Sequence, residues 1–400
     1  MWLIVIFTQK GGALLVTKNF ILLLVVALLV FINFFSFVVV IPLYVIDLNG
    51  SEFHVGFQNA LFYISAILFR GYFGPLADVK GRRLPLFIGI LAFSGASALF
   101  LISNNLWHIY GIRIFQSIGL AAFFSTGGSL VGDMAPPGKS GVYMGGYRLI
   151  NTLALLLGPW IAISTINSFN YQAWFTLGAI IGLLALVIAC FIEIPTISSQ
   201  GSEGNVDTTF IDRFKNAFQM ENARVIFLGT GIIACSLGIL QTFASVYTEK
   251  VTEIANPGLY FTIFGIAGII ANVLSGYLTD NWGRSKVPWP FLTLMGLGLF
   301  IFALLPYNEI FFLLSSLIAG FGFGGGITAL FTWTIEVSGE QLRATALSIQ
   351  ESAIDISIAM GSFIFGILVA MIDYSISFVF VGFVTVVLGV ILMRKYSFSN

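Results

Sequence analysis

Twelve long apolar segments constrain this chain more than any other feature of its sequence. A segment of about 20 apolar residues is long enough to cross the hydrocarbon core of a bilayer as a helix. Helix is the expected structure of each segment, because a lipid-exposed backbone must satisfy its own hydrogen bonds. The predicted spans are 20–46, 54–77, 84–103, 107–132, 141–166, 172–194, 223–248, 257–279, 287–305, 309–337, 344–371 and 374–393. The sequence therefore predicts an all-α membrane protein with twelve transmembrane helices.

The composition agrees with lipid as the main solvent. Hydrophobic residues make up 58% of the chain and charged residues 9%, against roughly 25% charged residues in soluble proteins. Lysine plus arginine and aspartate plus glutamate are balanced at 18 each, and no basic face suggests a nucleic-acid partner. The two histidines, His54 and His108, lie far from any cysteine or carboxylate cluster. We therefore expect no metal, no cofactor and no enzymatic activity.

The loop charges predict the orientation of the spans. Cytoplasmic loops of membrane proteins carry an excess of lysine and arginine. With the N-terminus inside, most of these residues fall on the cytoplasmic side: Lys10, Lys18, Lys80, Arg82, Arg83, Lys139, Arg213, Lys215, Arg224, Arg284, Lys286, Arg343, Arg394 and Lys395. We therefore predict a multi-pass protein of the cell membrane with both termini in the cytoplasm.

A polar connection divides the spans into two groups of six. Residues 195–222 contain Phe210, Phe214 and Phe218 at helical spacing, which predicts either an amphipathic helix on the inner membrane surface or a solvated linker. The predicted organisation is an N-terminal six-helix bundle over 1–194, this cytoplasmic linker, and a C-terminal six-helix bundle over 223–400.

The two bundles repeat each other in sequence. Asp78 and Asp280 are 202 residues apart, and Tyr44 and Tyr247 are 203 apart. Three further pairs show the 203-residue offset: Gly119 with Gly322, Asp133 with Glu336, and Gly158 with Gly361. A near-constant offset indicates duplication, and so predicts two pseudo-symmetric halves of the kind that alternating-access transporters use.

The loop after the second span carries the strongest local motif. It reads GPLADVKGRR from Gly74 to Arg83, and a second copy, GYLTDNWGRSK, runs from Gly276 to Lys286 at the same place in the other half. Both resemble the signature loop of the major facilitator superfamily. The resemblance implies a conformational switch at the cytoplasmic ends of the bundles, made of Gly74, Asp78, Gly81, Arg82, Arg83, Asp280, Gly283 and Arg284. We expect Arg70 to join this cluster. The alternative is a positive-inside loop with a tight turn.

Two further motifs lie in the fourth and fifth spans. Arg113 and Gln116 are similar to a fourth-helix pattern that in related proton antiporters is linked to proton movement, although the glycine stands at 119 rather than 117. A buried arginine in a membrane needs a partner or a cavity, so a structural role is the alternative. Gly158 and Pro159 look like a degraded form of the antiporter pattern, and proline bends a helix. A plain packing kink is the alternative there.

Two carboxylates mark the eleventh span. Glu351 and Asp355 lie one helical turn apart, about 6 Å by helical rise, on a stripe of small and polar residues. Burial and mutual repulsion favour a proton on at least one of them. By the repeat offset Glu351 corresponds to Arg148. Our hypothesis is that the two carboxylates couple proton binding to substrate release, with Arg113 and Arg148 tuning them. The alternative is static salt bridges with arginine.

Polar groups on the helices that line the path in related transporters complete the candidate site. They include Asn33, Gln116 and Gln241, with aromatic neighbours that suit an amphipathic or lipophilic solute. The whole chain resembles the bacterial and archaeal twelve-helix drug and metabolite proton antiporters. We therefore expect a monomeric secondary transporter that exports a small solute at the expense of the proton gradient. The alternative is proton-coupled uptake or facilitated transport of an organic anion or other metabolite.

Overall fold

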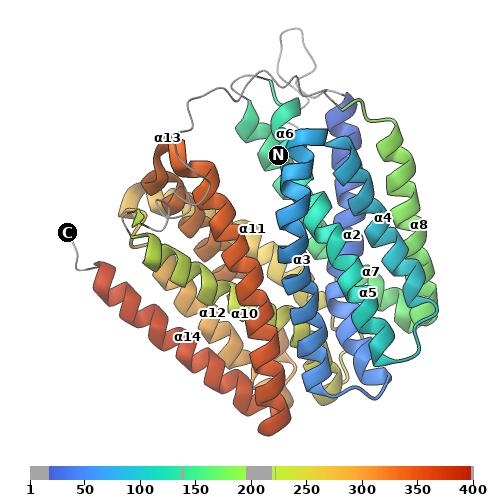
Figure 1. Ribbon diagram of the computed structural model, residues 1–400. Helices are drawn as coiled ribbons and strands as arrows, with labels where there is room; N and C mark the ends of the chain where they lie inside the picture. The colour runs from blue at the N-terminus through green and yellow to red at the C-terminus, as the bar shows by residue number, and fades with distance from the viewer. Residues whose placement is uncertain (1–17, 137–138, 195–218, 221, 398–400) are drawn as a thin grey trace, which may run out of the picture.

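The computed structural model describes residues 18–136, 139–194, 219–220 and 222–397, and every regular element in these ranges is helical. Figure 1 shows the helices gathered in two side-by-side groups. In chain order they are α2 (Lys18–Asp47), α3 (Glu52–Lys80), α4 (Arg83–Phe100), α5 (Leu106–Gly119), the π-helical η1 (Leu120–Phe124), α6 (Ser125–Met134), α7 (Ser140–Ser168), α8 (Tyr171–Cys190), α10 (Ala223–Val251), α11 (Leu259–Trp282), α12 (Pro288–Phe302), the 3-10 turn η2 (Leu305–Tyr307), α13 (Ile310–Met371) and α14 (Tyr374–Ser397).

All twelve predicted spans are helical, so the predicted fold class is confirmed. Ten segments of the described helices are long and apolar enough to cross a membrane. The other two are α3, which carries several polar side chains along its 29 residues, and α12, which has 15 residues. The fourth span is a continuous run of α5, η1 and α6.

One difference from prediction is that the tenth and eleventh spans share a single helical element. Helix α13 has 62 residues and would be about 93 Å long if it were straight, three times the thickness of a bilayer core. It holds two separate spans, Ile310–Ser338 and Thr345–Met371. The backbone therefore keeps its helical hydrogen bonds through the connection between them, where the sequence predicted a break.

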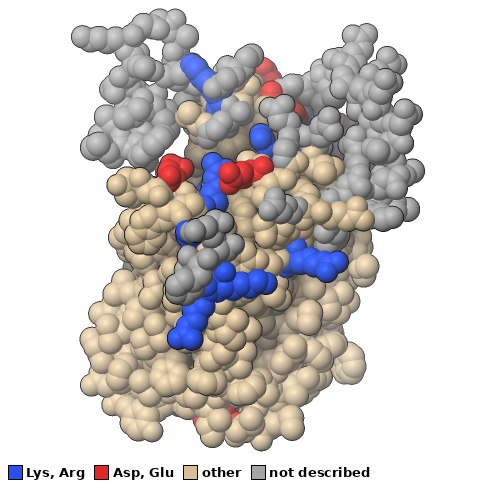
Figure 2. All heavy atoms as spheres, turned by 90° about the vertical axis from the view of Figure 1, so that its left-hand side faces the viewer, with Lys and Arg blue, Asp and Glu red and all other residues tan. Residues whose placement is uncertain are grey.

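We call the chain up to α8 the N half and the chain from α10 onward the C half. The basic end is the end that carries the turns at Gly81–Arg83 and Gly283–Lys286, uppermost in Figure 1, and the opposite end is the far end. Figure 2 shows lysine and arginine side chains from the top to the middle of one face, whose lower part is almost entirely uncharged. The boundary at 195–222 stays a prediction, because most of that segment lies outside the described residues.

Tyrosines confirm the internal repeat in three dimensions. The Tyr44 hydroxyl donates a hydrogen bond to the carbonyl oxygen of Ser103 at 2.7 Å. In the C half the Tyr247 hydroxyl donates to the carbonyl oxygen of Ala303 at 3.2 Å. Both bonds join the first helix of a half to the connection that follows its third helix. The 203-residue offset therefore relates equivalent hydrogen bonds as well as identical residues.

Glycines repeat in the same way. A Cβ atom on Gly158 would lie 2.9 Å from the Ile32 carbonyl oxygen, and one on Gly361 would lie 2.5 Å from that of Cys235. These glycines let the first and fifth helices of each half approach closely. The predicted packing role of Gly158 is thus met by α2. Pro159 lies inside the continuous helix α7.

The halves meet mainly along three helix pairs, with a smaller contact between α3 and α10. Helix α3 packs against α13, α7 against α11, and α2 against α10. The first and last of these pairs bring together the helices that carry four of the seven predicted coupling and cavity residues, namely Asn33, Gln241, Glu351 and Asp355. The site is therefore built at the boundary between the halves.

Candidate functional site

Arg113 is the centre of a buried polar cluster on α5 and α3. Its side chain is 1% exposed. One guanidinium nitrogen donates to Gln116 Oε1 at 2.6 Å and another donates to Asn59 Oδ1 at 3.0 Å. The guanidinium also lies over the Phe62 ring, 4.0 Å from its centroid. All three partners are neutral, so no carboxylate within the described part of the chain pairs with this charge.

Asn59 carries this cluster across to the C half. Its amide nitrogen donates to Thr242 Oγ1 at 2.8 Å and to Ser362 Oγ at 2.9 Å. Thr242 lies on α10 and Ser362 on α13, whereas Asn59 lies on α3. Sequence reasoning missed Asn59, although an asparagine inside an apolar span was a usable signal.

A second polar contact crosses the boundary nearer the basic end. Arg70 Nη1 on α3 lies 2.6 Å from Asp355 Oδ2 on α13. The prediction that Arg70 belongs to the loop cluster is wrong, because its guanidinium reaches across to the other half instead. Each partner is ten residues from the basic end of its span, which places the pair about 15 Å deep. It joins the two halves inside the membrane.

Glu351 and Arg148 do not contact each other. Both side chains are exposed, and no described partner lies within ion-pair distance of either. The Arg148 guanidinium instead lies over the Phe331 ring of the C half, 5.4 Å from its centroid. The structure therefore places Arg70, rather than Arg113 or Arg148, against the predicted carboxylate Asp355.

Tyr63 lies between the two crossing contacts. This buried residue of α3 stands between Asn59 and Arg70 in sequence and on the same side of the helix. Its position on the same helix as Asn59 and Arg70 means that one face of α3 presents three polar groups to the boundary. That face connects the Arg113–Asn59 cluster with the Arg70–Asp355 pair.

The predicted cavity amides occupy different environments. Asn33 donates to Ser97 Oγ at 3.1 Å and to the Gly178 carbonyl oxygen at 2.9 Å, so it joins three helices of the N half. Gln241 on α10 is buried, and its Oε1 accepts no hydrogen bond from the described residues. The Nε2 of Gln116 is also buried, and it donates no hydrogen bond to the described residues. Each of the three amides thus keeps one buried atom without a described partner: Oδ1 of Asn33, Oε1 of Gln241 and Nε2 of Gln116.

The repeated loops form equivalent ion pairs within each half. Arg82 Nε lies 3.2 Å from Asp133 Oδ2, and Arg284 Nη1 lies 2.9 Å from Glu336 Oε2. The preceding glycines, Gly81 and Gly283, both have a φ angle of +88°, a conformation that favours glycine.

The aspartates of the two loop motifs make no described ion pair. Asp280 is exposed and has no such partner in the described ranges. The Asp78 side chain lies outside the described part, while Gly74 lies within α3. Arg83 lies over the Phe87 ring at 5.8 Å. The described pairs therefore fasten loops to helices inside one half and do not latch one half to the other.

The far end joins the halves directly. Lys250 Nζ of α10 lies 3.1 Å from Glu52 Oε1 of α3. The Thr262 hydroxyl of α11 donates to the Leu156 carbonyl oxygen of α7 at 2.7 Å, and a Cβ on Gly258 would lie 2.6 Å from the Pro159 carbonyl oxygen. The helix that carries the predicted kink therefore packs closely against the C half.

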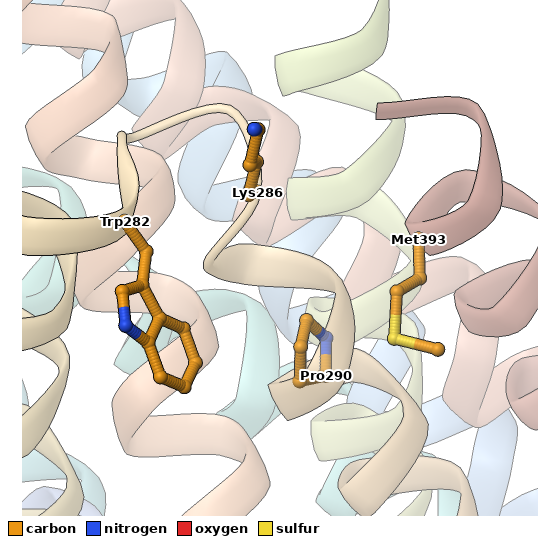
Figure 3. Close-up of a pocket in the computed structure, with 4 residues that line it drawn as sticks. All are labelled: Trp282, Lys286, Pro290 and Met393. Atoms are coloured by element: carbon orange, nitrogen blue, oxygen red, sulfur yellow. The ribbon is translucent and has the colours of Figure 1, made fainter. Parts of the chain in front are cut away.

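A surface hollow lies apart from these groups. It is lined by Trp282, Lys286, Pro290 and Met393 at the basic end of the C half, and Figure 3 shows the Lys286 amine directed away from the other three side chains. None of these residues belongs to the predicted site. Among the described residues, no group of three or more His, Cys, Asp or Glu side chains is placed to hold a metal ion.

Known proteins resemble this chain in fold and family. Among solved structures, the nucleoside transporter NupG has a TM-score of 0.80 at 13% identity, covering 96% of this chain and 100% of that chain. A bacterial homologue of the human lysosomal transporter Spinster, inward-facing and unoccupied, has a TM-score of 0.78 at 16% identity, covering 97% of both chains. These likenesses concern the fold.

Sequence relatives agree with that fold. A staphylopine export protein of Staphylococcus aureus (strain Mu50) is 24% identical, covering 89% of this chain and 91% of that protein. The quinolone resistance protein NorA of Staphylococcus aureus (strain COL) is 21% identical, covering 86% and 94%. The family model described as Major Facilitator Superfamily matches residues 23–255 and 226–398. The chain, a non-enzymatic secondary transporter with helices that cross the membrane many times, belongs to the Major Facilitator Superfamily.

Proposed function

We propose that this transporter exports a small amphipathic or lipophilic solute in exchange for protons, working as a monomer by alternating access. The observation that carries this proposal is the Arg70–Asp355 ion pair, which joins α3 of the N half to α13 of the C half at 2.6 Å. A titratable group that itself holds the halves together gives a direct link between proton binding and their movement.

The chemistry of the pair explains the coupling. An ionised Asp355 attracts Arg70, and a pair with little water around it is strong while both charges are present. A proton on Asp355 removes the attraction and leaves Arg70 without its counter-charge, so α3 and α13 are free to separate at this depth. Loss of the proton restores the contact. Glu351 lies one turn away towards the basic end, where its exposed carboxylate is placed to pass protons to Asp355.

The orientation and the relatives support export as the direction of transport. We infer that the basic end faces the cytoplasm, because lysine and arginine gather there. The far end is then the outer end, and its contacts between the halves close the pathway on that side. Two relatives are named for export or for drug resistance, which supports outward movement of the solute.

The test is transport in proteoliposomes with a fluorescent quinolone as the probe and an imposed proton gradient. Asp355→Asn removes the titrating group, and we expect loss of gradient-driven accumulation with retention of probe exchange down its own gradient. Glu351→Gln should slow the coupled process. A matched control is Glu52→Gln, which cuts another ion pair between the halves, from α3 to α10 at the exposed far end, and should leave coupling intact. Gradient-driven accumulation in both Asp355→Asn and Glu351→Gln would sink the proposal.

A second candidate function rests on Arg113. Its buried charge has neutral partners, and a substrate carboxylate or phosphate would compensate it with charge-assisted hydrogen bonds. This arrangement favours uptake or facilitated transport of an organic anion. Inverted vesicles separate the two candidates, because export predicts that the quinolone accumulates inside them when the gradient is acid inside. Accumulation of a monocarboxylate instead, abolished by Arg113→Lys, would favour the second candidate.

A further inference from the structure

We propose that Asn59 is a positioning residue that couples the state of Arg113 to closure of the far end. The proposal takes one premise from the second candidate function above, that Arg113 responds to a bound solute. Asn59 contacts Arg113 on one side and the C half on the other, so it is placed to make the two events depend on each other.

The polarity of the network fixes how the amide is turned. A guanidinium has donors and no acceptor, so the bond from Arg113 requires the oxygen of the Asn59 amide to face it. The amide nitrogen must then point the other way, towards the hydroxyl oxygens of Thr242 and Ser362, at 2.8 and 2.9 Å. Arg113 thereby sets the orientation in which Asn59 donates across the boundary.

Burial makes this orientation matter. Asn59 and Thr242 are 1% exposed and Ser362 is fully buried. A polar group buried in this way is costly unless it is hydrogen-bonded. The Ser362 hydroxyl also interacts with the Thr242 hydroxyl at 2.9 Å and donates to the Ile358 carbonyl oxygen at 2.8 Å. Each hydroxyl already uses its single proton in another hydrogen bond, so it can only accept from Asn59. If the amide group rotated and presented its oxygen instead, the two hydroxyls would have no proton left to donate to it.

Arg113 keeps donors for a ligand. Its Nε and the Nε2 of Gln116 are buried, and neither meets an acceptor among the described residues. A solute oxygen bound there draws the guanidinium away from Asn59. The amide then loses the contact that orients it, its bonds to the C half weaken, and the far end opens. A solute loaded from the basic end would thus trigger the opening that releases it.

Asn33 provides a matched control. It is also a buried asparagine, 1% exposed, whose amide nitrogen donates twice. Both of its acceptors, on Ser97 and Gly178, belong to the N half. A change at Asn33 therefore removes the same number of amide hydrogen bonds without cutting any link between the halves.

The experiment measures the distance between spin labels at the far end of the full chain in proteoliposomes, without solute or gradient. The labels replace Trp107 and Tyr307, which are exposed in opposite halves, after Cys190 and Cys235 are changed to serine. The first variant is the double change Thr242→Val plus Ser362→Ala, and the second is Arg113→Met. The triple variant combines these three changes, and Asn33→Leu is the control. Arg113→Lys is a further variant, in case Arg113→Met fails to fold.

We expect the first two variants each to raise the population with a long far-end distance about fivefold to thirtyfold, as loss of one or two net hydrogen bonds implies. The triple variant should gain little more, because both changes cut the same relay. Arg113→Lys should move the population the same way, and Asn33→Leu should not. If neither variant of Arg113 moves the distance, or if its effect adds fully to that of the hydroxyl changes, Asn59 is a simple clamp and the proposal is wrong.

This outcome is separable from failure of the proposed function. The distance measurement uses neither a substrate nor a proton gradient. If the protein proved to take up solutes, or to work without protons, the experiment would still decide whether the effects of Arg113 and the two hydroxyls are non-additive.

Discussion

At the far end hydrogen bonds and close helix contacts join one half to the other, whereas at the basic end the described loop ion pairs join helices of the same half. Gly56 shows the first arrangement, since a Cβ there would lie 2.4 Å from the Ser362 carbonyl oxygen. Arg284 and Glu336 show the second. The contrast teaches that the described loop ion pairs hold helices of one half together, while the described ion pairs between the halves lie at the far end and at Asp355.

The largest effect is expected from two glycines of the same helix. On α3, Gly56 touches α13, whereas a Cβ on Gly71 would meet no atom within 4 Å. Gly56→Ala must push the halves apart at the far end, at about 1–3 kcal/mol, as overpacking costs in general. Gly71→Ala should be neutral or slightly stabilising, because alanine favours helix. Spin-label distances at the far end measure both, and equal responses would contradict the comparison.

A hydrogen bond between the halves should give the next effect. Thr262→Val removes the bond to the Leu156 carbonyl oxygen, which is worth about 1 kcal/mol. We expect a shift of roughly fivefold towards the open far end, measured as the population of long distances. Ser315→Ala is the control, because the Ser315 hydroxyl bonds to Tyr260 and Gly298 within the C half. A shift of the same size in the control would mean that the far end is not special.

The basic end should respond less and in another observable. Arg284→Gln cuts a partly exposed ion pair within the C half, and such pairs contribute about 0–1 kcal/mol. We expect a small fall in thermal stability and no change in the far-end distance. Lys286→Gln, in the same turn but without an ion pair in the described ranges, is the control. A far-end shift in Arg284→Gln alone would show that this loop does latch the halves.

Apolar length and turn chemistry made the fold predictable. Each span is long enough to fix a helix by itself, and Gly81 and Gly283 mark sharp turns because their φ of +88° favours glycine. The continuous helix through residues 339–344 was not predicted, because a polar segment between two spans reads as a loop.

The pairing inside the site was harder to predict, for a physical reason. Which side chains meet depends on how two helices are rotated against each other, and apolar spans leave that rotation open. Glu351 and Arg148 are equivalent in the repeat, but equivalent positions occupy matching places in their own halves and meet only near the symmetry axis. Arg70 was assigned to the loop because it lies near it in sequence, yet it pairs with Asp355 across the boundary.

The smallest effect is expected from the exposed ion pair at the far end. Lys250 and Glu52 lie 3.1 Å apart with the lysine side chain 58% exposed, so water and salt screen their attraction, and such pairs contribute about 0.2–1 kcal/mol. Lys250→Gln should open the far end less than Thr262→Val does, and the difference from the unmodified protein should vanish in high salt. Lys250 also lies 4.9 Å from the Tyr374 ring of its own half, and that contact is less sensitive to screening. A salt-independent effect of Lys250→Gln would therefore assign its role to packing against Tyr374. An effect larger than that of Thr262→Val would mean that the surface ion pair, and not the hydrogen bond between the helices, contributes most to closing the far end.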